Sequence, residues 1–120
     1  MADQPVIIYH NARCSKSRAA CQLIAERGVP ATVINYLETP PSREELRALL
    51  AKLGMAAADL VRRSEPAYQD LYAGRTLSED EWITALATHP ILIERPIVVC
   101  GQRAVVGRPP ERALELLDTE

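Results

Sequence analysis

The order of apolar and polar positions predicts a strand–helix–strand unit at the start of the chain. Residues 5–9 form a short apolar run rich in β-branched side chains, which is typical of a buried strand. From residue 15 the apolar positions recur at helical spacing, and Gly28 stands where a helix commonly ends. A second β-branched run occupies residues 32–36. We expect the two strands to be parallel, with the helix as a right-handed crossover between them.

The middle of the chain predicts a helical insert at about residues 42–90. Ser42 and Glu45 have the spacing of a capping box, which opens a helix, and Gly54 stands at its end. Ser78 and Glu81 form a second capping box before another helix.

The stretch between these two helices has a weaker pattern. Residues 57–63 are expected to be helical, and residues 66–71 to be irregular or a short helix.

The last part of the chain predicts a hairpin followed by a helix. Residues 96–100 and 104–106 are apolar strands, and the Gly101-Gln102 pair between them suits a type II′ turn. Pro109-Pro110 then begins a final helix. The whole order is βαβ, a helical insert, then ββα, which predicts an α/β fold with a central mixed sheet.

Size and charge narrow the class of protein. The chain has 120 residues, 48% of them hydrophobic, which fits a single domain with one core. Its formal net charge of -2 gives no broad positive field for nucleic acid or anionic lipids, so any anion site has to be local. The 12 arginines and 2 lysines suit planar binding of oxyanions, although codon usage would give the same ratio.

The sequence also predicts a cellular compartment. The first residues lack the charged and apolar regions of a signal peptide, and no stretch approaches the roughly 18 apolar residues that cross a bilayer. We therefore expect a cytoplasmic protein that does not enter a membrane. The three cysteines are an odd number and are expected to be thiols in that reducing compartment.

Cys14 is the candidate nucleophile. It lies between the first predicted strand and helix, where free helix N–H groups and the helix dipole favour a thiolate and can hold a tetrahedral oxyanion. The nearby cations Arg13, Lys16 and Arg18, with His10 across the loop, are expected to lower the thiol pKa further. The nucleophile and the anion site would then coincide.

The neighbours of Cys14 have alternative interpretations. His10 either supports the thiolate electrostatically or is a polar loop residue that bonds to backbone. Ser17 either donates a hydrogen bond to the sulfur or is an ordinary serine of a first helical turn. Cys21 and Cys100 are expected in the core.

The segment Cys14-Ser15-Lys16-Ser17 points to a known fold. A Cys-x-x-Cys near a βαβ unit is typical of thioredoxin-like proteins, and here serine replaces the second cysteine. We therefore expect a thioredoxin-like fold that offers one sulfur.

Four ordered blocks of the sequence resemble the glutaredoxin-coupled arsenate reductases. They are YHNARCSKSR at residues 9–18, YLETPP at 36–41, ERPIVV at 94–99 and GRP at 107–109. Together they span nearly the whole chain, which makes the resemblance far more specific than an isolated Cys-x-x-Ser. Members of the family usually have proline where Ala12 stands, so the loop before Cys14 is expected to be less rigid here.

The resemblance implies roles for several residues. Cys14 would attack arsenate, with His10 nearby, while three arginines hold the oxygens: Arg62, Arg95 and Arg108. Arg63 adjoins Arg62 and is the alternative at that position. Pro96 corresponds to the cis-proline of thioredoxin-like proteins and, with Ser17, would shape the site.

The resemblance implies a glutathione- and glutaredoxin-dependent arsenate reductase that acts in arsenic detoxification, with no bound metal or cofactor and with glutathione as co-substrate. One alternative is a monothiol glutaredoxin-like oxidoreductase that removes glutathione from proteins. Another is a redox-sensing regulator that binds RNA polymerase through the helical insert, although redox sensors often have a second, resolving cysteine.

Overall fold

The computed structural model describes residues 6–118, and side chains as far as residue 116. The chain forms two compact units. The first, here called the sheet unit, is built from the two ends of the chain, up to Thr39 and from Arg95 onward. The second, the helical unit, is Pro40–Glu94 and contains the predicted insert. That the two units make up a single domain stays a prediction.

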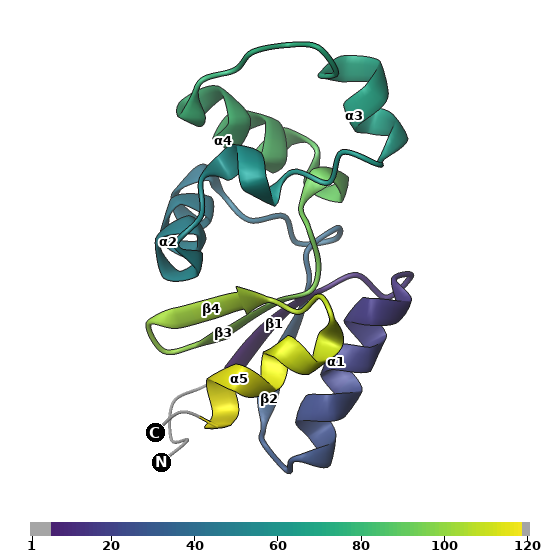
Figure 1. Cartoon of the computed structure of the whole chain (residues 1–120), viewed down its shortest axis with the longest axis vertical. Coiled ribbons are helices and arrows are strands. Elements are labelled where there is room, and N and C mark those ends of the chain that lie inside the picture. Colours follow the sequence, from purple (N-terminus) through teal and green to yellow (C-terminus); the bar gives the residue numbers. More distant parts are fainter. Residues whose placement is uncertain (1–5, 119–120) are drawn as a thin grey trace. The chain divides into compact units, whose positions relative to one another are not determined.

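The sheet unit contains a mixed four-stranded sheet, as predicted. Its strands are β1 (Val6–His10), β2 (Ala31–Asn35), β3 (Ile97–Cys100) and β4 (Arg103–Val106), in the order β2-β1-β3-β4. β1 is parallel to β2 and antiparallel to β3, which in turn is antiparallel to β4 (Figure 1). Helix α1 (Ser15–Glu26) connects the two parallel strands. The predicted start of the first strand, Pro5, lies outside the described residues.

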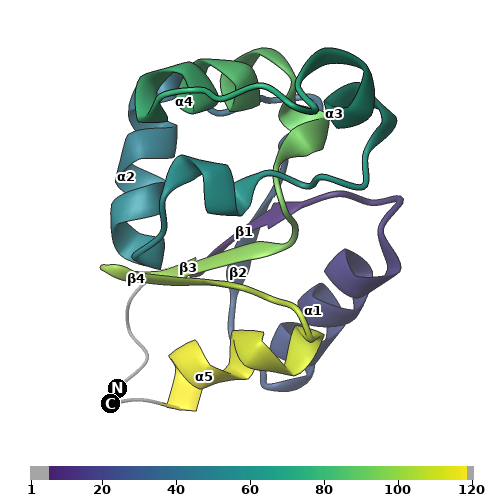
Figure 2. The same cartoon turned by 45° about the horizontal axis from the view of Figure 1, so that its top comes forward.

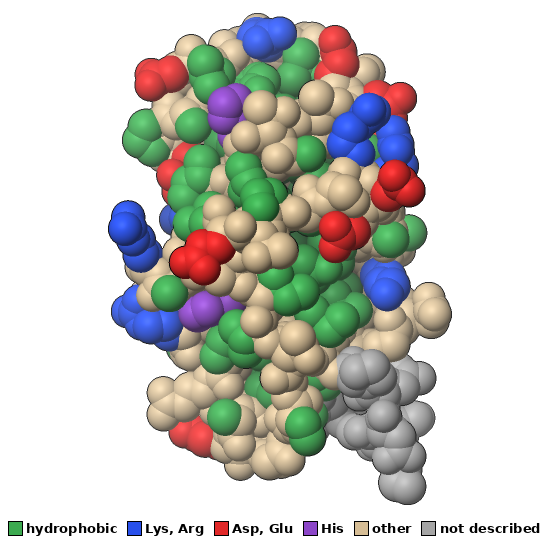
Figure 3. Space-filling view, turned by 180° about the vertical axis from the view of Figure 1, so that it is seen from behind, with side chains coloured by type: hydrophobic (Ala, Val, Ile, Leu, Met, Phe, Trp, Pro, Cys, Tyr) green, Lys and Arg blue, Asp and Glu red, His purple; other side chains and the backbone are tan. Residues whose placement is uncertain are grey.

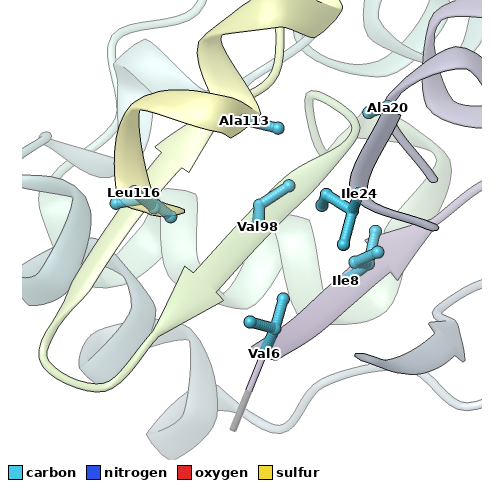
Figure 4. Close-up of a cluster of buried hydrophobic side chains, with 7 residues drawn as sticks. All are labelled: Val6, Ile8, Ala20, Ile24, Val98, Ala113 and Leu116. Carbon is cyan, nitrogen blue, oxygen red and sulfur yellow. The ribbon is translucent and has the colours of Figure 1, made fainter. Parts of the chain in front are cut away.

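Two helices cover one face of this sheet. α1 and the last helix, α5 (Ala113–Asp118), lie on the same side of the strands (Figures 1 and 2). Strand residues alternate between faces, so every second side chain points toward these helices. The resulting core, shown in Figure 4, consists of Val6, Ile8, Ala20, Ile24, Val98, Ala113 and Leu116. Each fully buried valine, leucine or isoleucine side chain stabilises the unit by about 1.5–3 kcal/mol.

The β3–β4 hairpin and the final helix follow the predicted order with one difference. Gly101 has a φ of 62°, and among the described residues only glycines have a positive φ. The positive φ of Gly101 agrees with the Gly-first turn expected from the sequence. Pro110–Arg112 forms a 3-10 turn (η3) that leads into α5, so the diproline begins a tighter turn than predicted. A proline at the first position of such a turn has no N–H to leave unpaired.

The helical unit begins both of its longer helices with complete capping boxes. In α2 (Arg43–Leu53), Ser42 accepts the Glu45 N–H and Glu45 accepts the Ser42 N–H. Ser78 and Glu81 do the same for α4 (Glu79–Thr88). Each helix thus satisfies two of its orphan N–H groups locally, which is why the sequence could predict both starts.

The helix expected at residues 57–63 is wrong beyond its first turn. A 3-10 turn (η1) occupies Ala57–Leu60, and Val61 then pairs as an isolated bridge with Ile93. Two backbone bonds flank this bridge, from Arg62 N–H to the Leu92 carbonyl (2.6 Å) and from Glu94 N–H to the Leu60 carbonyl (2.9 Å). Pairing between distant segments therefore overrides the local helical pattern.

Shorter helices complete the helical unit. They are α3 (Pro66–Leu71) and a 3-10 turn (η2) at Pro90–Leu92. The α3 segment takes the short-helix form that the sequence left open. The apolar core of this unit includes Leu46, Leu50, Leu60, Trp82, Ile83, Leu86 and Leu92.

Two properties of the described residues bear on the type of partner. Between residues 6 and 118, none of the helices has both the length and the apolar character that crossing a membrane requires. On the face in Figure 3, lysine and arginine side chains are interspersed with aspartate and glutamate, as expected for a net charge of -2.

Candidate active site

The strand register brings three segments of the sheet unit together at one end of the sheet. Ile97, the first residue of β3, lies opposite Tyr9 near the end of β1 and opposite Val106 at the end of β4. The loop that follows β1, the residues just before β3 and the residues just after β4 are therefore neighbours. They contain Cys14, Arg95 and Arg108 respectively.

Cys14 is the N-cap residue of α1. Its backbone is extended (φ -97°, ψ 120°), and its N–H donates to the Asn11 carbonyl at 3.0 Å, which closes a tight turn. Its side chain is partly exposed. The thiol thus lies at the positive end of the helix, where the first N–H groups have no partner within the helix.

Four groups favour the thiolate form of Cys14. Burial of the thiol raises its pKa, but the backbone N–H groups of Ser17 and Lys16 and the guanidinium groups of Arg108 and Arg95 lower it. The lowering effects are larger together, so the pKa of Cys14 lies below the ordinary value for cysteine. The side chain of Arg108 and the first turn of α1 therefore both stabilise the charged sulfur.

Arg108 is the cation in direct contact with the sulfur. Its Nη2 donates to Cys14 Sγ at 3.4 Å, and its Nε donates to the Arg95 carbonyl at 2.7 Å. The first distance is within the range for a hydrogen bond to sulfur. Arg108 thereby joins the segment before β3 to the nucleophile.

Gly107 allows the segments beside Arg108 to approach closely. Its N–H donates to the Pro96 carbonyl at 2.8 Å, and a Cβ at this position would lie 3.0 Å from Pro96 Cγ. The Arg95-Pro96 peptide bond is cis, as the resemblance predicted, and so is Arg108-Pro109. Any side chain at residue 107 would push against Pro96.

Arg95 is nearly inaccessible to solvent and is held by a residue that the sequence analysis left without a role. Only 5% of Arg95 is exposed, and its side chain hydrogen-bonds to the hydroxyl of Tyr36. Tyr36 also hydrogen-bonds to the side chain of Asn11. Tyr36 and Arg95 both lie in family-like blocks of the sequence, but nothing in the sequence showed that they contact each other.

His10 and Ser17 form a contact different from the one expected. Ser17 Oγ lies 2.6 Å from His10 Nδ1 and accepts the Asn11 N–H at 3.0 Å, so this hydroxyl bonds to the histidine and the loop. The group of Ser17 that bonds to Cys14 is its backbone N–H. The contacts of the Ser17 hydroxyl are thus with His10 and the Asn11 N–H. A structural role for Ser17 at the site stays a prediction.

The surroundings of His10 disfavour its charged form. Burial, followed by the positive charge of Arg18, lowers the pKa of His10, and a hydrogen bond with Ser17 opposes this shift only partly. The protonated imidazole is therefore disfavoured, and the positive charges that lower the pKa of Cys14 are those of Arg108 and Arg95. His10 Nδ1 also lies 3.6 Å from Cys21 Sγ, so Cys21 borders this contact as well as the core.

The loop before Cys14 is fastened by side chains where the family usually has proline. Arg18 Nη1 donates to the Ala12 carbonyl at 2.7 Å, and Asn11 Oδ1 accepts the Arg13 N–H at 2.9 Å. Arg18 thus bonds to the loop and lowers the pKa of His10. The sequence had suggested that Arg18 would lower the pKa of the Cys14 thiol directly.

Arg62 belongs to the helical unit. Its guanidinium forms ion pairs with Glu65 (3.0 Å) and Glu94 (3.5 Å), and the neighbouring Arg63 donates to the Tyr68 hydroxyl at 2.8 Å. A role for either arginine toward the substrate stays a prediction.

Comparison with known proteins places this arrangement in a family. The model of the ArsC family matches residues 9–116, a stretch that contains all the candidate site residues. The chain belongs to the ArsC family. An arsenate reductase from Neisseria meningitidis is 47% identical over 106 residues, which cover 87% of this chain and 91% of that protein. The Escherichia coli protein YfgD is 49% identical, over 93% of this chain and 96% of that protein.

Solved structures of the ArsC family have the same fold. An arsenate reductase from Vibrio cholerae superimposes with a TM-score of 0.89 at 48% identity, and covers 93% of this chain and 97% of that chain. The mixed sheet with its interrupted βαβ and ββα parts is therefore the thioredoxin-like fold that the sequence predicted.

Proposed function

We propose that this chain is an arsenate reductase in which Cys14 is the nucleophile and external thiols supply the electrons. The observation that carries the proposal is the contact of 3.4 Å between Arg108 Nη2 and Cys14 Sγ at the start of α1. It combines a lowered thiol pKa with donors suited to an oxyanion. The names of the ArsC-family relatives support arsenate as that oxyanion.

The first step of the proposed reaction forms a bond between sulfur and arsenic. The Cys14 thiolate attacks arsenic and displaces one oxygen as hydroxide, which takes up a proton and leaves as water. Arg95 and Arg108 stabilise the negative oxygens in this step, because guanidinium groups can each bind two oxygens of a tetrahedral anion. Arg62, or Arg63 beside it, is the proposed third arginine.

Later steps reduce arsenic from the +5 to the +3 state. Glutathione attacks the arsenic of the adduct and displaces a second oxygen as water. A glutaredoxin thiolate then attacks the glutathione sulfur, which forms a mixed disulfide and leaves arsenic in the +3 state on Cys14. Water hydrolyses the remaining bond between arsenic and sulfur, so that arsenite leaves and Cys14 is again a thiolate. Two thiols together lose two electrons and two protons and become a disulfide, while arsenate loses one oxygen as water. No metal or bound cofactor takes part in this scheme.

Coupled turnover tests the function directly. Arsenate reduction is followed through NADPH oxidation in the presence of glutathione, glutaredoxin and glutathione reductase, with Cys14→Ser as the inactive variant and Cys100→Ala as the matched control. The wild type and Cys100→Ala should turn over arsenate, while Cys14→Ser should not. A wild type without turnover overturns the proposal. Activity on a glutathione mixed disulfide alone would then identify a glutaredoxin-like oxidoreductase, and retention of RNA polymerase on the immobilised protein would identify a regulator.

A further inference from the structure

Tyr36 places a buried hydroxyl beside the site. The residue follows β2 directly and has 0% of its surface exposed. A phenylalanine would fill the same space with no polar atom to satisfy, and a buried hydroxyl costs free energy unless it is hydrogen-bonded. The hydroxyl of Tyr36 is bonded, to the side chains of Asn11 and Arg95. Its two partners indicate what it does.

Both partners donate to the Tyr36 oxygen. Asn11 Oδ1 already accepts the Arg13 N–H at 2.9 Å, which directs the amide NH2 of Asn11 to Tyr36. Arginine has only donors. Burial raises the pKa of Tyr36 to about 12, with these donors acting in the opposite direction, so the hydroxyl stays neutral at a pH where Cys14 is already a thiolate. Tyr36 therefore acts as a fixed acceptor between two donors.

Each partner of Tyr36 leads to the nucleophile by a separate route. Asn11 closes the turn before α1, because its carbonyl accepts the Cys14 N–H at 3.0 Å. Arg95 lowers the pKa of Cys14 through its charge, and its carbonyl accepts from Arg108 Nε at 2.7 Å. The Tyr36 hydroxyl thus connects the loop that carries the sulfur to the arginine that stabilises the charge.

We propose that Tyr36 is a positioning residue, which holds the Arg95 guanidinium and the Asn11 turn in fixed relation so that the Cys14 thiolate and its oxyanion are bound together. An unrestrained arginine side chain loses much rotamer freedom when it binds an anion. The bond to Tyr36 removes part of that freedom before the substrate arrives. The substrate side of this inference rests on the proposed function, whereas its effect on the thiol does not.

The variant Tyr36→Phe tests the inference, because it keeps the ring and removes the acceptor. The midpoint of iodoacetamide alkylation of Cys14 against pH should rise, since Arg95 is less well placed to stabilise the thiolate. The KM for arsenate should rise, and kcat/KM should fall between about five- and thirtyfold, the loss expected for one or two hydrogen bonds. Tyr68→Phe is the matched control: it removes a tyrosine hydroxyl that accepts from Arg63 at 2.8 Å in the helical unit, and it should leave the alkylation midpoint unchanged.

The outcomes separate the inference from the proposed function. A Tyr36→Phe protein that melts at a lower temperature but keeps the wild-type midpoint and KM shows a purely structural tyrosine and overturns the inference. A wild type that does not reduce arsenate removes the proposed function, and the alkylation midpoint then decides the role of Tyr36 alone. Should Tyr36→Phe fail to fold, NMR of the Arg95 guanidinium in the wild type decides: restricted rotation supports the inference, and free rotation with rapid exchange overturns it.

Discussion

The charge on Cys14 is stabilised by groups of two kinds. The N–H groups of Ser17 and Lys16 are local and belong to the same helix as the sulfur, whereas Arg95 and Arg108 come from the far end of the sequence. Burial opposes both kinds, so the thiol depends on their sum. His10 is protonated less readily than an ordinary histidine, because burial and Arg18 lower its pKa. Substituting these residues one at a time should therefore show how much each lowers the pKa of Cys14.

Cys14 should alkylate as a low-pKa thiol. Its lowered pKa means that the thiolate forms at a lower pH than in an unfolded chain. The pH midpoint of the iodoacetamide rate should therefore lie below the pKa of free cysteine, which is roughly 8.5. Measured on the double variant Cys21→Ala with Cys100→Ala, the signal comes from Cys14 alone. In the wild-type protein Cys21 is the contrast, because burial raises its pKa. A Cys14 midpoint at or above that of free cysteine contradicts the activated thiolate.

Arg95→Lys and Arg108→Lys should keep the fold and lose arsenate turnover. An ammonium retains the charge but not the planar pair of donors, and loss of a charge-assisted hydrogen bond corresponds to roughly a ten- to hundredfold fall in kcat/KM. Arg112→Lys is the matched control, because Arg112 is half-exposed and pairs with Glu115 on the surface. If both site variants turned over arsenate at the wild-type rate, charge alone would be sufficient and the two-pronged contact would be irrelevant.

Helix starts could be predicted from the sequence because the groups that hydrogen-bond at a helix start lie within three residues of each other. Both capping boxes and the N-terminal position of Cys14 are of this kind. The helix expected at residues 57–63 was wrong because Val61 pairs with Ile93, and no local pattern contains that contact. The same limit applied to the site: the family-like blocks identified Cys14, Arg95 and Arg108, but the bond between Tyr36 and Arg95 depends on how separate strands pack.

Gly107→Ala should disturb the segment that joins β4 to the site. The new methyl group would meet Pro96 Cγ at 3.0 Å, and relief of an overpacked contact costs about 1–3 kcal/mol. Because Arg108 is the next residue, the Cys14 alkylation midpoint should rise along with the loss of stability measured by denaturant unfolding.

Gly74→Ala is the control for the Gly107 variant. Gly74 has a φ of 79° with open space around it, so alanine there costs backbone strain of about 1 kcal/mol without a contact to the site. It should lower stability and leave the alkylation midpoint unchanged. Equal midpoints in the Gly107 and wild-type proteins would show that Pro96 adjusts without moving Arg108.

The residues singled out as site candidates fall in two units. The sheet unit contains Cys14, Arg95 and Arg108, while the helical unit follows β2 and precedes β3 in the chain and contains Arg62 and Arg63. The other two cysteines also belong to the sheet unit and pack against its core. This placement suits structural thiols better than a redox partner for Cys14.

Turnover by the complete protein should require an outside thiol. Cys21 is seven residues after Cys14, and a helical rise of about 1.5 Å per residue puts their Cα atoms roughly 10 Å apart, whereas a disulfide tolerates about 7 Å. The double variant Cys21→Ala with Cys100→Ala should therefore stay active with glutathione and glutaredoxin, and thioredoxin alone should support little turnover. Loss of activity in the folded double variant, or full activity with thioredoxin alone, would reveal an internal resolving cysteine.

The contact between Cys14 and Arg108 joins residues 94 positions apart, and this has a consequence for protein synthesis. In a nascent chain, Cys14 and the start of α1 are synthesised long before the ribosome has added Arg95 or Arg108. Until the C-terminal hairpin joins the sheet, the sulfur has only the N–H groups of its own helix and remains closer to an ordinary thiol. We therefore expect the low-pKa thiol to arise late in biosynthesis, once the C-terminal hairpin has joined the sheet.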